Sequence, residues 1–376
     1  MIRKTRALLL RLFAALVPLL LFAPVVTHAA DEKVYKFSMQ TGVPSASLYF
    51  KLLEKFSKQI DTMSGGRLKA EILPAGAVVG PFEILDAVSS DVVKSGYAWP
   101  NYWSGKNSAF VLFSNVPAST GLDQSSFIAW YYRGGGDKLY DELLQDVMHL
   151  KVKVLLVHPM GPDPLGWFKK PIGNMEEFAK FKYRSPPGIP GETYKDMGVA
   201  AVGLPGGEIV PAAQRGVIDA AEWIGPADDM NLGLQKVWKY YYLQGLHQQS
   251  DVGQILFNKG FWDSLPPDLQ EIMRSAAKAN MAETLEANIY DNAVALHQFE
   301  DKDGVKVLDT PADYYPKFIA AERKVTQGYA EKNPFFKKVL DSQIAFAKMV
   351  YPYQSRVLGL YFNMLNTAHD QPAQKK

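Results

Sequence analysis

Strand-like and helix-like patterns alternate along most of this chain, and that order constrains its fold more than any other feature. Residues 34–39 alternate apolar and polar side chains, as a half-buried strand does. Residues 48–63 then repeat apolar side chains at helical spacing, and residues 68–73 return to a strand pattern. Because strand–helix–strand order usually joins parallel strands, we expect an α/β fold with mainly parallel sheets and helices on both faces.

The chain is long enough for two lobes. About 345 of its 376 residues remain after a leader of 30, which is more than one core usually serves. We expect lobe 1 at residues 31–154 and lobe 2 at residues 155–245. A strand at 254–258 then returns to lobe 1, which residues 246–285 complete. Strands exchanged between lobes in this way would form a hinge that closes around a ligand.

The C-terminal part of the chain, residues 286–376, is predicted to consist of long helices. Pro352 interrupts the last helical run and predicts a kink or a break there. This run carries Phe, Met, Tyr and Leu on several faces, more apolar surface than one lobe covers. Two interpretations stay open: the helices pack across the back of both lobes, or they form a homodimer interface.

The first 30 residues have the layout of a cleaved signal peptide. Arg3, Lys4, Arg6 and Arg11 form a basic region at the start of an almost wholly apolar run at 7–26, which is followed by the small residues Ala29 and Ala30. A membrane anchor of about 20 residues is the alternative, but Pro18 and Pro24 favour cleavage. The expected product is an exported soluble protein.

Composition narrows the class of exported protein. The chain has no Cys, which excludes both a lipid anchor on a new N-terminal Cys and any disulfide. Loss of the four basic leader residues would leave 37 basic and 39 acidic residues, a formal net charge of −2. A nearly neutral protein gives no electrostatic reason to expect nucleic acid or an anionic membrane as partner.

Three loops place a charged residue beside Gly, Pro or aromatic residues at the predicted end of a strand. They carry Asp163, Arg184 and Glu222. A planar guanidinium pairs bidentately with a carboxylate, so such a set suits a small anion and a cation. Taken singly, the Arg more often forms a structural ion pair, and the Asp could simply organise a turn.

An ordered series of motifs resembles a known family. It includes Tyr102-Trp-x-Gly-Lys106, Trp130-Tyr-Tyr-x-Gly-Gly-Gly136, Gly166-Trp-Phe-x-Lys170 and Asp219-Ala-Ala-Glu-Trp-Ile-Gly-Pro226. The series is similar to the TRAP-type, DctP-like extracytoplasmic solute receptors, in the branch that binds 2-oxo and 2-hydroxy monocarboxylates. The likeness covers roughly residues 34–275. It implies a two-lobe periplasmic-binding-protein-like fold, a periplasmic location and delivery of the solute to a membrane permease, with no enzymatic activity.

The resemblance also implies roles for individual residues. Arg184 would clamp the ligand carboxylate, and Glu222 with the main-chain carbonyl of Trp223 would hold a cation that touches the ligand. On the first lobe, Tyr102 and Asn101, which stands where an additional Tyr is common in the family, are our candidates for bonding a keto or hydroxyl oxygen of a lactate- or pyruvate-type acid. The remaining expected ligand contacts are Trp99, whose ring would form a wall of the pocket, and Gln248.

Two departures from the family pattern bear on the ligand and the cation. Asp163 stands where this branch often has Gln, and two carboxylates at one oxygen site favour Ca²⁺ over Na⁺. Leu246-His247-Gln248-Gln249 stands where Trp-His-Glu-Pro is usual. The acid's chain length, and whether it is keto or hydroxy, therefore stay open.

Two other classes of function compete with that of a receptor. A periplasmic hydrolase could use Asp163 and Glu222 as a carboxylate pair, although the chain has no recognisable nucleophile or phosphate-loop motif. A structural or sensory module is a third class. His158 and His247 lie near the expected site in the sequence, and we interpret both as structural.

Overall fold

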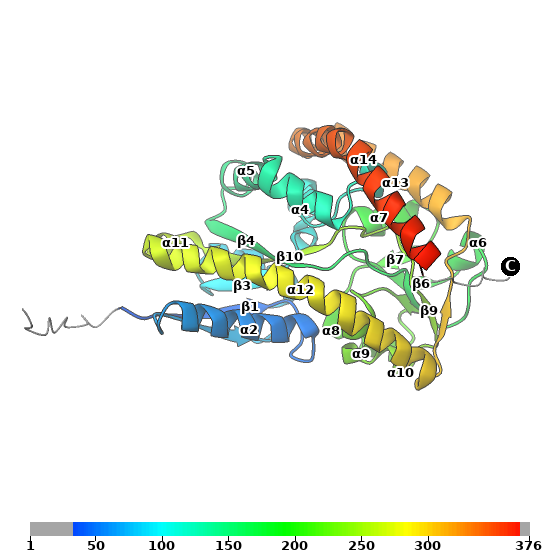
Figure 1. The fold of residues 1–376 in the computed structure, drawn as a ribbon, viewed down its shortest axis with the longest axis horizontal. Helices are drawn as coiled ribbons and strands as arrows, with labels where there is room; N and C mark the ends of the chain where they lie inside the picture. Colours follow the sequence, from blue (N-terminus) through cyan, green and yellow to red (C-terminus); the bar gives the residue numbers. More distant parts are fainter. Residues whose placement is uncertain (1–32, 369–376) are drawn as a thin grey trace, which may run out of the picture. The chain divides into compact units, whose positions relative to one another are not determined.

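Two β-sheets organise the part of the chain that the structure describes, residues 33–368 of a computed structural model (Figure 1). The predicted signal peptide at residues 1–30 lies outside these residues. From Tyr35 onward the chain forms one compact unit. Among the described helices, none has the length and apolar character needed to cross a membrane.

The first sheet has five strands in the order β2-β1-β3-β10-β4. The bounds are β2 Leu68–Leu73, β1 Tyr35–Thr41, β3 Ser95–Ala98, β10 Val252–Asn258 and β4 Val152–Pro159. Strand β10 is antiparallel to both of its neighbours, and the other four strands run in one direction. The expected return of a strand near residue 254 to this sheet is therefore observed.

The second sheet has six short strands in the order β11-β9-β5-β8-β6-β7. The bounds are β11 Lys306–Leu308, β9 Tyr240–Tyr242, β5 Gly166–Phe168, β8 Ala220–Ala221, β6 Lys182–Arg184 and β7 Ala200–Val202. Only β5 runs against the rest of this sheet. The prediction of an α/β fold with mainly parallel sheets is thus confirmed.

Helices cover both sheets because their apolar stripes need burial. Helix α2 (Leu48–Met63) buries Leu53, Phe56 and Ile60 completely against the first sheet. Helix α12 (Pro267–Asp301) runs lengthwise past both sheets (Figure 1). The other α-helices are α3 Ile84–Ser89, α4 Gln124–Arg133, α5 Gly136–Glu142, α6 Met175–Phe178, α7 Ile189–Asp196, α8 Gly206–Gln214, α9 Pro226–Leu232, α10 Leu234–Val237, α11 Lys259–Asp263, α13 Tyr314–Lys332 and α14 Pro334–Ala368.

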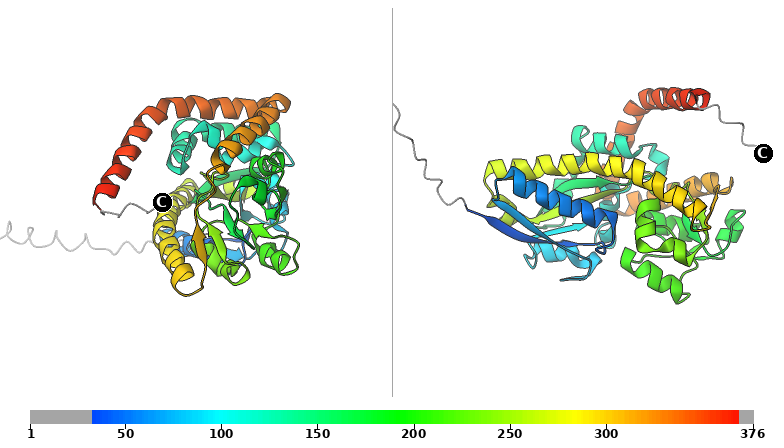
Figure 2. Two further views of the ribbon diagram at one scale, coloured as in Figure 1. Left: turned by 90° about the vertical axis from the view of Figure 1, so that its right-hand side faces the viewer. Right: turned by 60° about the horizontal axis from the view of Figure 1, so that its bottom comes forward.

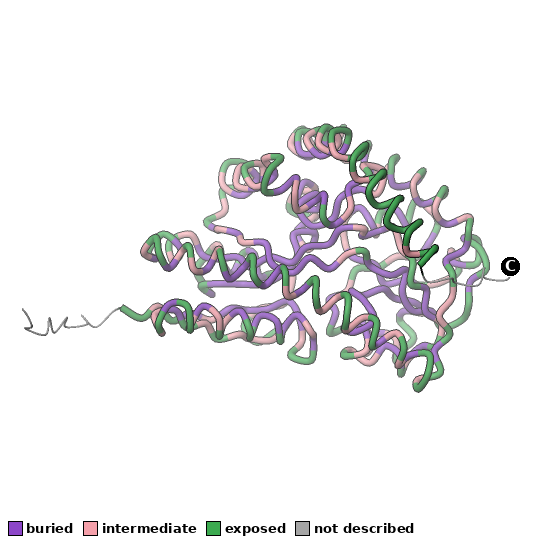
Figure 3. Tube along the Cα trace, in the orientation of Figure 1, coloured by how far each residue is buried: buried purple, intermediate pink, exposed green. Residues whose placement is uncertain are grey.

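Helix α14 contains Pro352 and continues past it to Ala368. Of the two outcomes expected for this proline, a break is therefore wrong, and Figure 2 shows the helix bent along its length. A proline inside a helix removes one backbone hydrogen bond and commonly bends the axis without ending the helix. The second half of α14 is almost wholly exposed (Figure 3).

Three segments connect the sheets: residues 160–165 on the way out, residues 243–251 on the way back, and residues 259–305, which contain α12. The first two segments are the ones that reach the site. They lie side by side, since Met160 N donates to Asp251 O at 2.8 Å and Asp163 N donates to Gln248 O at 2.9 Å. We call the five-stranded sheet with its helices lobe 1 and the six-stranded sheet with its helices lobe 2. Strand β4 stays in the first sheet as far as Pro159, beyond the division expected at residue 154, and the domain boundaries remain predictions.

A buried acid fastens α9 to the second sheet. Trp167 Nε1 in β5 donates to Asp229 Oδ2 at 2.8 Å, and both side chains are fully buried. Burial raises the pKa of Asp229 to about 8, although the bond from Trp167 acts in the opposite direction. The native state therefore keeps a proton here that the unfolded chain releases near pH 4.

This difference predicts how stability depends on pH. Between about pH 4 and pH 8 the native state binds the extra proton, so the free energy of unfolding falls as pH rises, by about 1.4 kcal/mol per pH unit for one proton. Asp229→Asn should remove this contribution and flatten the slope measured by urea unfolding at pH 5 and pH 8. Equal slopes in parent and variant would contradict the assignment.

Candidate functional site

The predicted site residues stand at the carboxyl ends of parallel strands. Arg184 is the last residue of β6, and Glu222 directly follows β8, the strand beside it. On the first sheet, Trp99, Asn101 and Tyr102 follow β3 in the same way. Ligands of open α/β sheets bind at this end of the strands, because neighbouring strands deliver loop side chains to one edge there.

The connecting segments supply the other members of the site. Asp163 comes from the outgoing segment, and Gln248 and Asp251 come from the returning one. Together with the strand-end residues they enclose a space of about 20 Å³, enough for about one water molecule. Its lining residues come from both lobes and are Trp99, Asn101, Tyr102, Asp163, Arg184, Pro186, Glu222, Trp223, Ile224, Gln248 and Asp251.

Arg184 is held in place on every side of its guanidinium group. Nη2 and Nε donate to the carbonyl of Leu204 at 2.8 and 3.0 Å, and Nη1 donates to the carbonyl of Glu222 at 3.1 Å. Nη1 also forms an ion pair with the Glu222 carboxylate. The guanidinium carbon lies 5.2 Å from the centroid of the Trp223 ring, a cation–π distance. These contacts fix the orientation of the Arg184 guanidinium without help from a ligand.

Several polar atoms of the residues that line this space are buried without a hydrogen-bond partner among the described residues. They are Trp99 Nε1, Asn101 Oδ1, Tyr102 OH, Asp163 Oδ1 and Glu222 Oε2. Buried polar groups are nearly always paired, because each one left unpaired costs about 1–3 kcal/mol. Such a concentration of unpaired donors and acceptors fits a site whose partners are a polar ligand and a cation.

Acidic groups outnumber basic ones in the site. Asp163, Glu222 and Asp251 face the single guanidinium of Arg184, and all four side chains are buried. Burial raises the pKa of Asp163 well above its usual range, and the charges of Asp251 and Glu222 raise it further. Burial also raises the pKa of Asp251 to about 7, against the opposing bond from Ser114. A cation bound here would relieve this repulsion between carboxylates.

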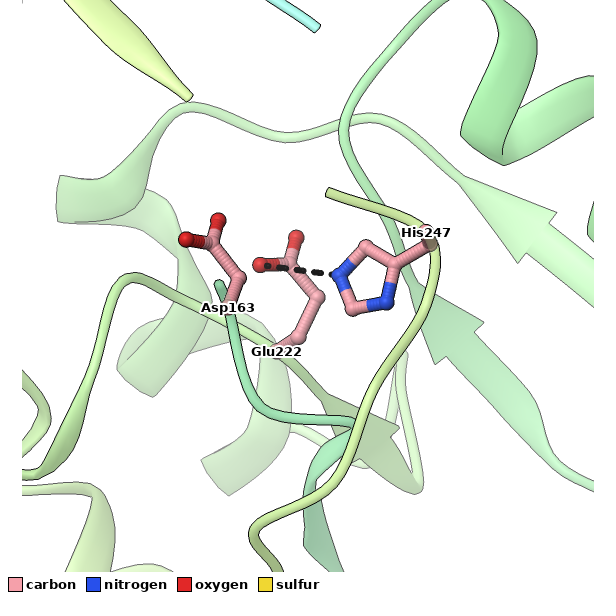
Figure 4. Close-up of side chains that lie close together, drawn as sticks. All are labelled: Asp163, Glu222 and His247. Atoms are coloured by element: carbon pink, nitrogen blue, oxygen red, sulfur yellow. Dashed lines mark ion pairs between the residues drawn. The ribbon is translucent and has the colours of Figure 1, made fainter. Parts of the chain in front are cut away.

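His247 lies beside the two carboxylates that we predicted as cation ligands. Figure 4 shows the Glu222 carboxylate between Asp163 and the His247 ring. His247 Nε2 is 3.7 Å from Glu222 Oε2, and one ligand atom from each of the three residues falls within 4.8 Å of the others. Neither ring nitrogen of His247 has a hydrogen-bond partner among the described residues. The sequence had suggested a structural role, whereas the structure places this ring at the site.

His158 behaves differently. Its Nδ1 lies 2.8 Å from Tyr97 OH, and burial lowers its pKa to about 3, so the ring is neutral and packed among aromatic side chains. Its structural interpretation agrees with this environment. Asp251 was missed by sequence reasoning, although a signal existed: it directly precedes β10, whose antiparallel start lies beside the carboxyl end of β3.

A family model described as bacterial extracellular solute-binding protein, family 7 (DctP), matches residues 38–333. The chain belongs to this family. A monocarboxylate 2-oxoacid-binding periplasmic protein of Nostoc sp. (strain PCC 7120) is 31% identical over 328 residues, with 85% of each chain covered. The resemblance to TRAP-type solute receptors seen in the sequence is thereby confirmed.

Solved structures of this family have the same fold. A TRAP transporter solute-binding protein from Bordetella bronchiseptica RB50 superposes with a TM-score of 0.82 at 26% identity, covering 89% of this chain and 99% of that one. A TRAP periplasmic solute-binding protein from Pseudoalteromonas atlantica T6c gives a TM-score of 0.81 at 27% identity, with 88% and 99% covered. The two-lobe periplasmic-binding-protein-like architecture expected from the sequence is confirmed.

Membership of the DctP family decides between the classes of function. The proteins of this family are solute receptors that work with a membrane permease, so this chain is a periplasmic solute-binding protein of a TRAP transporter and not an enzyme. The hydrolase alternative, with Asp163 and Glu222 as a carboxylate pair, is set aside. In the structure the Glu222 carboxylate is paired with the guanidinium of Arg184.

The Arg184–Glu222 pair predicts a strong stability coupling. Glu222→Gln leaves a buried guanidinium without its counter-charge, which should lower the free energy of unfolding of the ligand-free protein by about 3–5 kcal/mol. Adding Arg184→Met should recover a large part of that loss, because the uncompensated charge is then gone. Urea unfolding of the two single variants and the double variant tests this, and additive losses would contradict a direct pair.

Proposed function

We propose that this receptor binds a small monocarboxylate of the pyruvate or lactate type together with a bridging cation, and delivers it to the permease. Arg184 would anchor the carboxylate, with the cation held by Asp163, Glu222 and the main-chain carbonyl of Trp223. The leader at residues 1–30 would direct export and be cleaved. The observation that carries this proposal is the buried Arg184–Glu222 pair inside a ring of unpartnered polar atoms.

This pair explains why an anion and a cation would enter together. A ligand carboxylate that binds Arg184 must compete with Glu222 for the same guanidinium edge. If Glu222 lost Arg184 without replacement, its charge would be buried and uncompensated, which costs several kcal/mol. A cation beside Glu222 offsets that charge, so the ligand carboxylate and the cation together substitute for the ion pair.

The donor atoms favour a hard cation. Asp163 Oδ1 and Glu222 Oε2 are unpartnered oxygens, and carboxylate and carbonyl oxygens are the ligands that Ca²⁺ prefers. Two carboxylates favour Ca²⁺ over Na⁺, which stays the alternative. His247 stands close enough to interact with the same ion or to hold Glu222 in position.

The rest of the lining suits a short carbon chain with one further oxygen. Asn101, Tyr102 and Gln248 offer hydrogen bonds to a keto or hydroxyl oxygen, and the Trp99 ring would cover the carbon skeleton. Relatives support this class: the Nostoc protein is named for 2-oxoacids, and the Pseudoalteromonas structure holds sodium and pyruvate. The Bordetella structure holds calcium and picolinate.

We further propose that a second copy of the chain covers the exposed half of α14. Its large exposed apolar side chains are Met349, Tyr351, Tyr353, Val357, Leu358, Leu360, Tyr361, Phe362 and Met364. At helical spacing they occupy most of the circumference, leaving a polar stripe at Ser355, Arg356, Asn363 and Asn366. Four of the nine are aromatic, so the exposed apolar area is of the order of the ~800 Å² per partner that stable interfaces bury. The Bordetella relative is described as a dimer.

Ligand-induced thermal stabilisation tests the carboxylate anchor. A ligand present at 100 times its Kd adds about 2.7 kcal/mol to the stability of the native state, so pyruvate or lactate with CaCl₂ should raise the Tm of the parent protein. Arg184→Ala should abolish that rise. Lys182→Ala is the matched control, because Lys182 lies two residues away on the same strand with its side chain exposed, and it should respond as the parent does.

The same measurement of Tm distinguishes Ca²⁺ from Na⁺ as the bound cation. After chelation, pyruvate alone should stabilise the parent weakly, and adding back CaCl₂ should restore the full rise in Tm more effectively than NaCl. Asp163→Asn should reverse that preference, since it removes one of the two carboxylates. A parent response unchanged by chelator, or an Arg184→Ala variant that still responds fully, would overturn the proposed arrangement.

The dimer is tested by the mass of the protein in solution. Leu360→Glu and Phe362→Glu should convert a dimer into a monomer, because each buries a charge in an apolar interface. Asn363→Glu adds the same charge on the polar stripe of the same turn and should leave the dimer intact. Sedimentation equilibrium measures the mass of the parent protein and of the three variants in solution. A parent protein that is monomeric at about 50 µM would exclude this interface.

A further inference from the structure

The binding site of this receptor is closed to solvent in the structure. Arg184 is 2% exposed, and Asp163 and Glu222 are each 1% exposed. The side chains that enclose the site come from both lobes, so a solute can reach them only if the lobes separate. The closed arrangement must therefore be stabilised by contacts between the lobes that a separation would break.

Asp228 makes such a contact outside the site itself. It lies in α9 of lobe 2 and is 1% exposed. Its Oδ1 accepts from the backbone N–H of Leu48 at 2.6 Å, and its Oδ2 accepts from the Ser47 hydroxyl at 3.2 Å. Ser47 and Leu48 are the N-cap and the first residue of α2, which covers the sheet of lobe 1. A carboxylate of one lobe thus caps a helix of the other.

The N-terminus of α2 needs such a partner. The first N–H groups of a helix have no acceptor within the helix, and the aligned peptide dipoles place a partial positive charge at this end. Helix α2 has no acidic residue in its own first turn. Its N-cap hydroxyl already accepts from the N–H of Tyr49, so the N–H of Leu48 is left to Asp228.

The same carboxylate also reaches the binding site. Trp223 Nε1 donates to Asp228 Oδ2 at 2.6 Å, and the Trp223 ring lies under the guanidinium of Arg184. Gly206 packs closely against the six-membered part of the same ring, since a Cβ built on Gly206 would stand 2.3 Å from it. Asp228 therefore binds two elements with one carboxylate. Its oxygens accept from the N-terminus of α2, which must move when the lobes open, and from the indole of Trp223, which supports Arg184.

We propose that Asp228 is a closure latch, which stabilises the closed lobes by capping α2 and at the same time fixes Trp223 beneath Arg184. Opening breaks the bonds to Leu48 and Ser47 and leaves the bond to Trp223, which lies within lobe 2. The latch rests on the receptor function of the chain and not on which acid it carries. Asp228 acts through other residues, as a positioning residue.

The α2 side of the latch can be removed by one backbone change. Leu48→Pro deletes the N–H that Asp228 accepts, and proline is well suited to the first position of a helix. Ser47 has ψ 142°, the extended conformation that a residue before proline adopts. Leu48→Ala is the matched control, because it also loses the leucine side chain but keeps the N–H.

The absence of Cys from the chain allows the lobes to be labelled cleanly. Lys58→Cys in α2 and Arg215→Cys at the end of α8 are both exposed, one on each lobe, and paired spin labels there report the distance between lobes. The ratio of closed to open molecules should be about fivefold or more lower in Leu48→Pro than in Leu48→Ala, as expected for the loss of a hydrogen bond to a charged group. Dissociation of pyruvate with CaCl₂ present should accelerate by a similar factor.

A second pair of variants distinguishes an acid that holds the lobes closed from a buried acid that only stabilises lobe 2. Asp228→Asn should shift the lobes toward the open distance. Asp229→Asn, a neighbouring buried acid whose bonds stay within lobe 2, should leave the distance distribution unchanged. Equal distributions in Leu48→Pro and Leu48→Ala, both without ligand and with pyruvate and CaCl₂, overturn the latch. If the parent protein does not bind pyruvate, the proposed ligand is wrong, and the ligand-free distances still decide on the latch.

Discussion

A buried guanidinium paired with a buried carboxylate is the interaction on which the rest of this receptor depends. Two charges removed from water cost several kcal/mol each unless their geometry is well matched, and here carbonyl groups, an indole ring and neighbouring loops all fix Arg184 and Glu222 in place. The pair gives the site a stable ligand-free form. In the proposed mechanism, an entering anion displaces the Glu222 carboxylate from Arg184, and a bound cation supplies the positive charge that this carboxylate then needs.

The topology of the two sheets places this pair where it is useful. Both residues leave parallel strands at their carboxyl ends, facing the segments that connect the lobes. Asp163 and Asp251 lie on those connecting segments, so the charged groups of the site stand between the two lobes. Closing the lobes would therefore bring the acids, the Arg and the aromatic walls together in a single step, and it excludes the water that would weaken their attraction.

Sequence reasoning recovered the α/β alternation, because the hydrophobic periods of α2 and β2 are strong local signals, and both elements match their expected bounds. The composition of three loops singled out Asp163, Arg184 and Glu222 as a set, the family resemblance suggested roles for Arg184 and Glu222, and the structure brings the three together. The role of each residue at the site remains a proposal. His247 and Asp251 escaped assignment because their importance comes from neighbours such as Glu222, which is 25 or more residues away along the chain.

By itself, the sequence determined the helices and strands, the solute-receptor family and the charged residues that are candidates for the site, since periodicity and motifs are properties of neighbouring residues. The tertiary structure alone decided that Arg184 pairs with Glu222, that His247 stands beside them, and that Asp228 joins α2 to Trp223. These contacts join residues that are far apart along the chain or lie on different elements. No local pattern encodes them, because buried charges are positioned by packing in three dimensions, where burial and the nearest counter-charge set their energies.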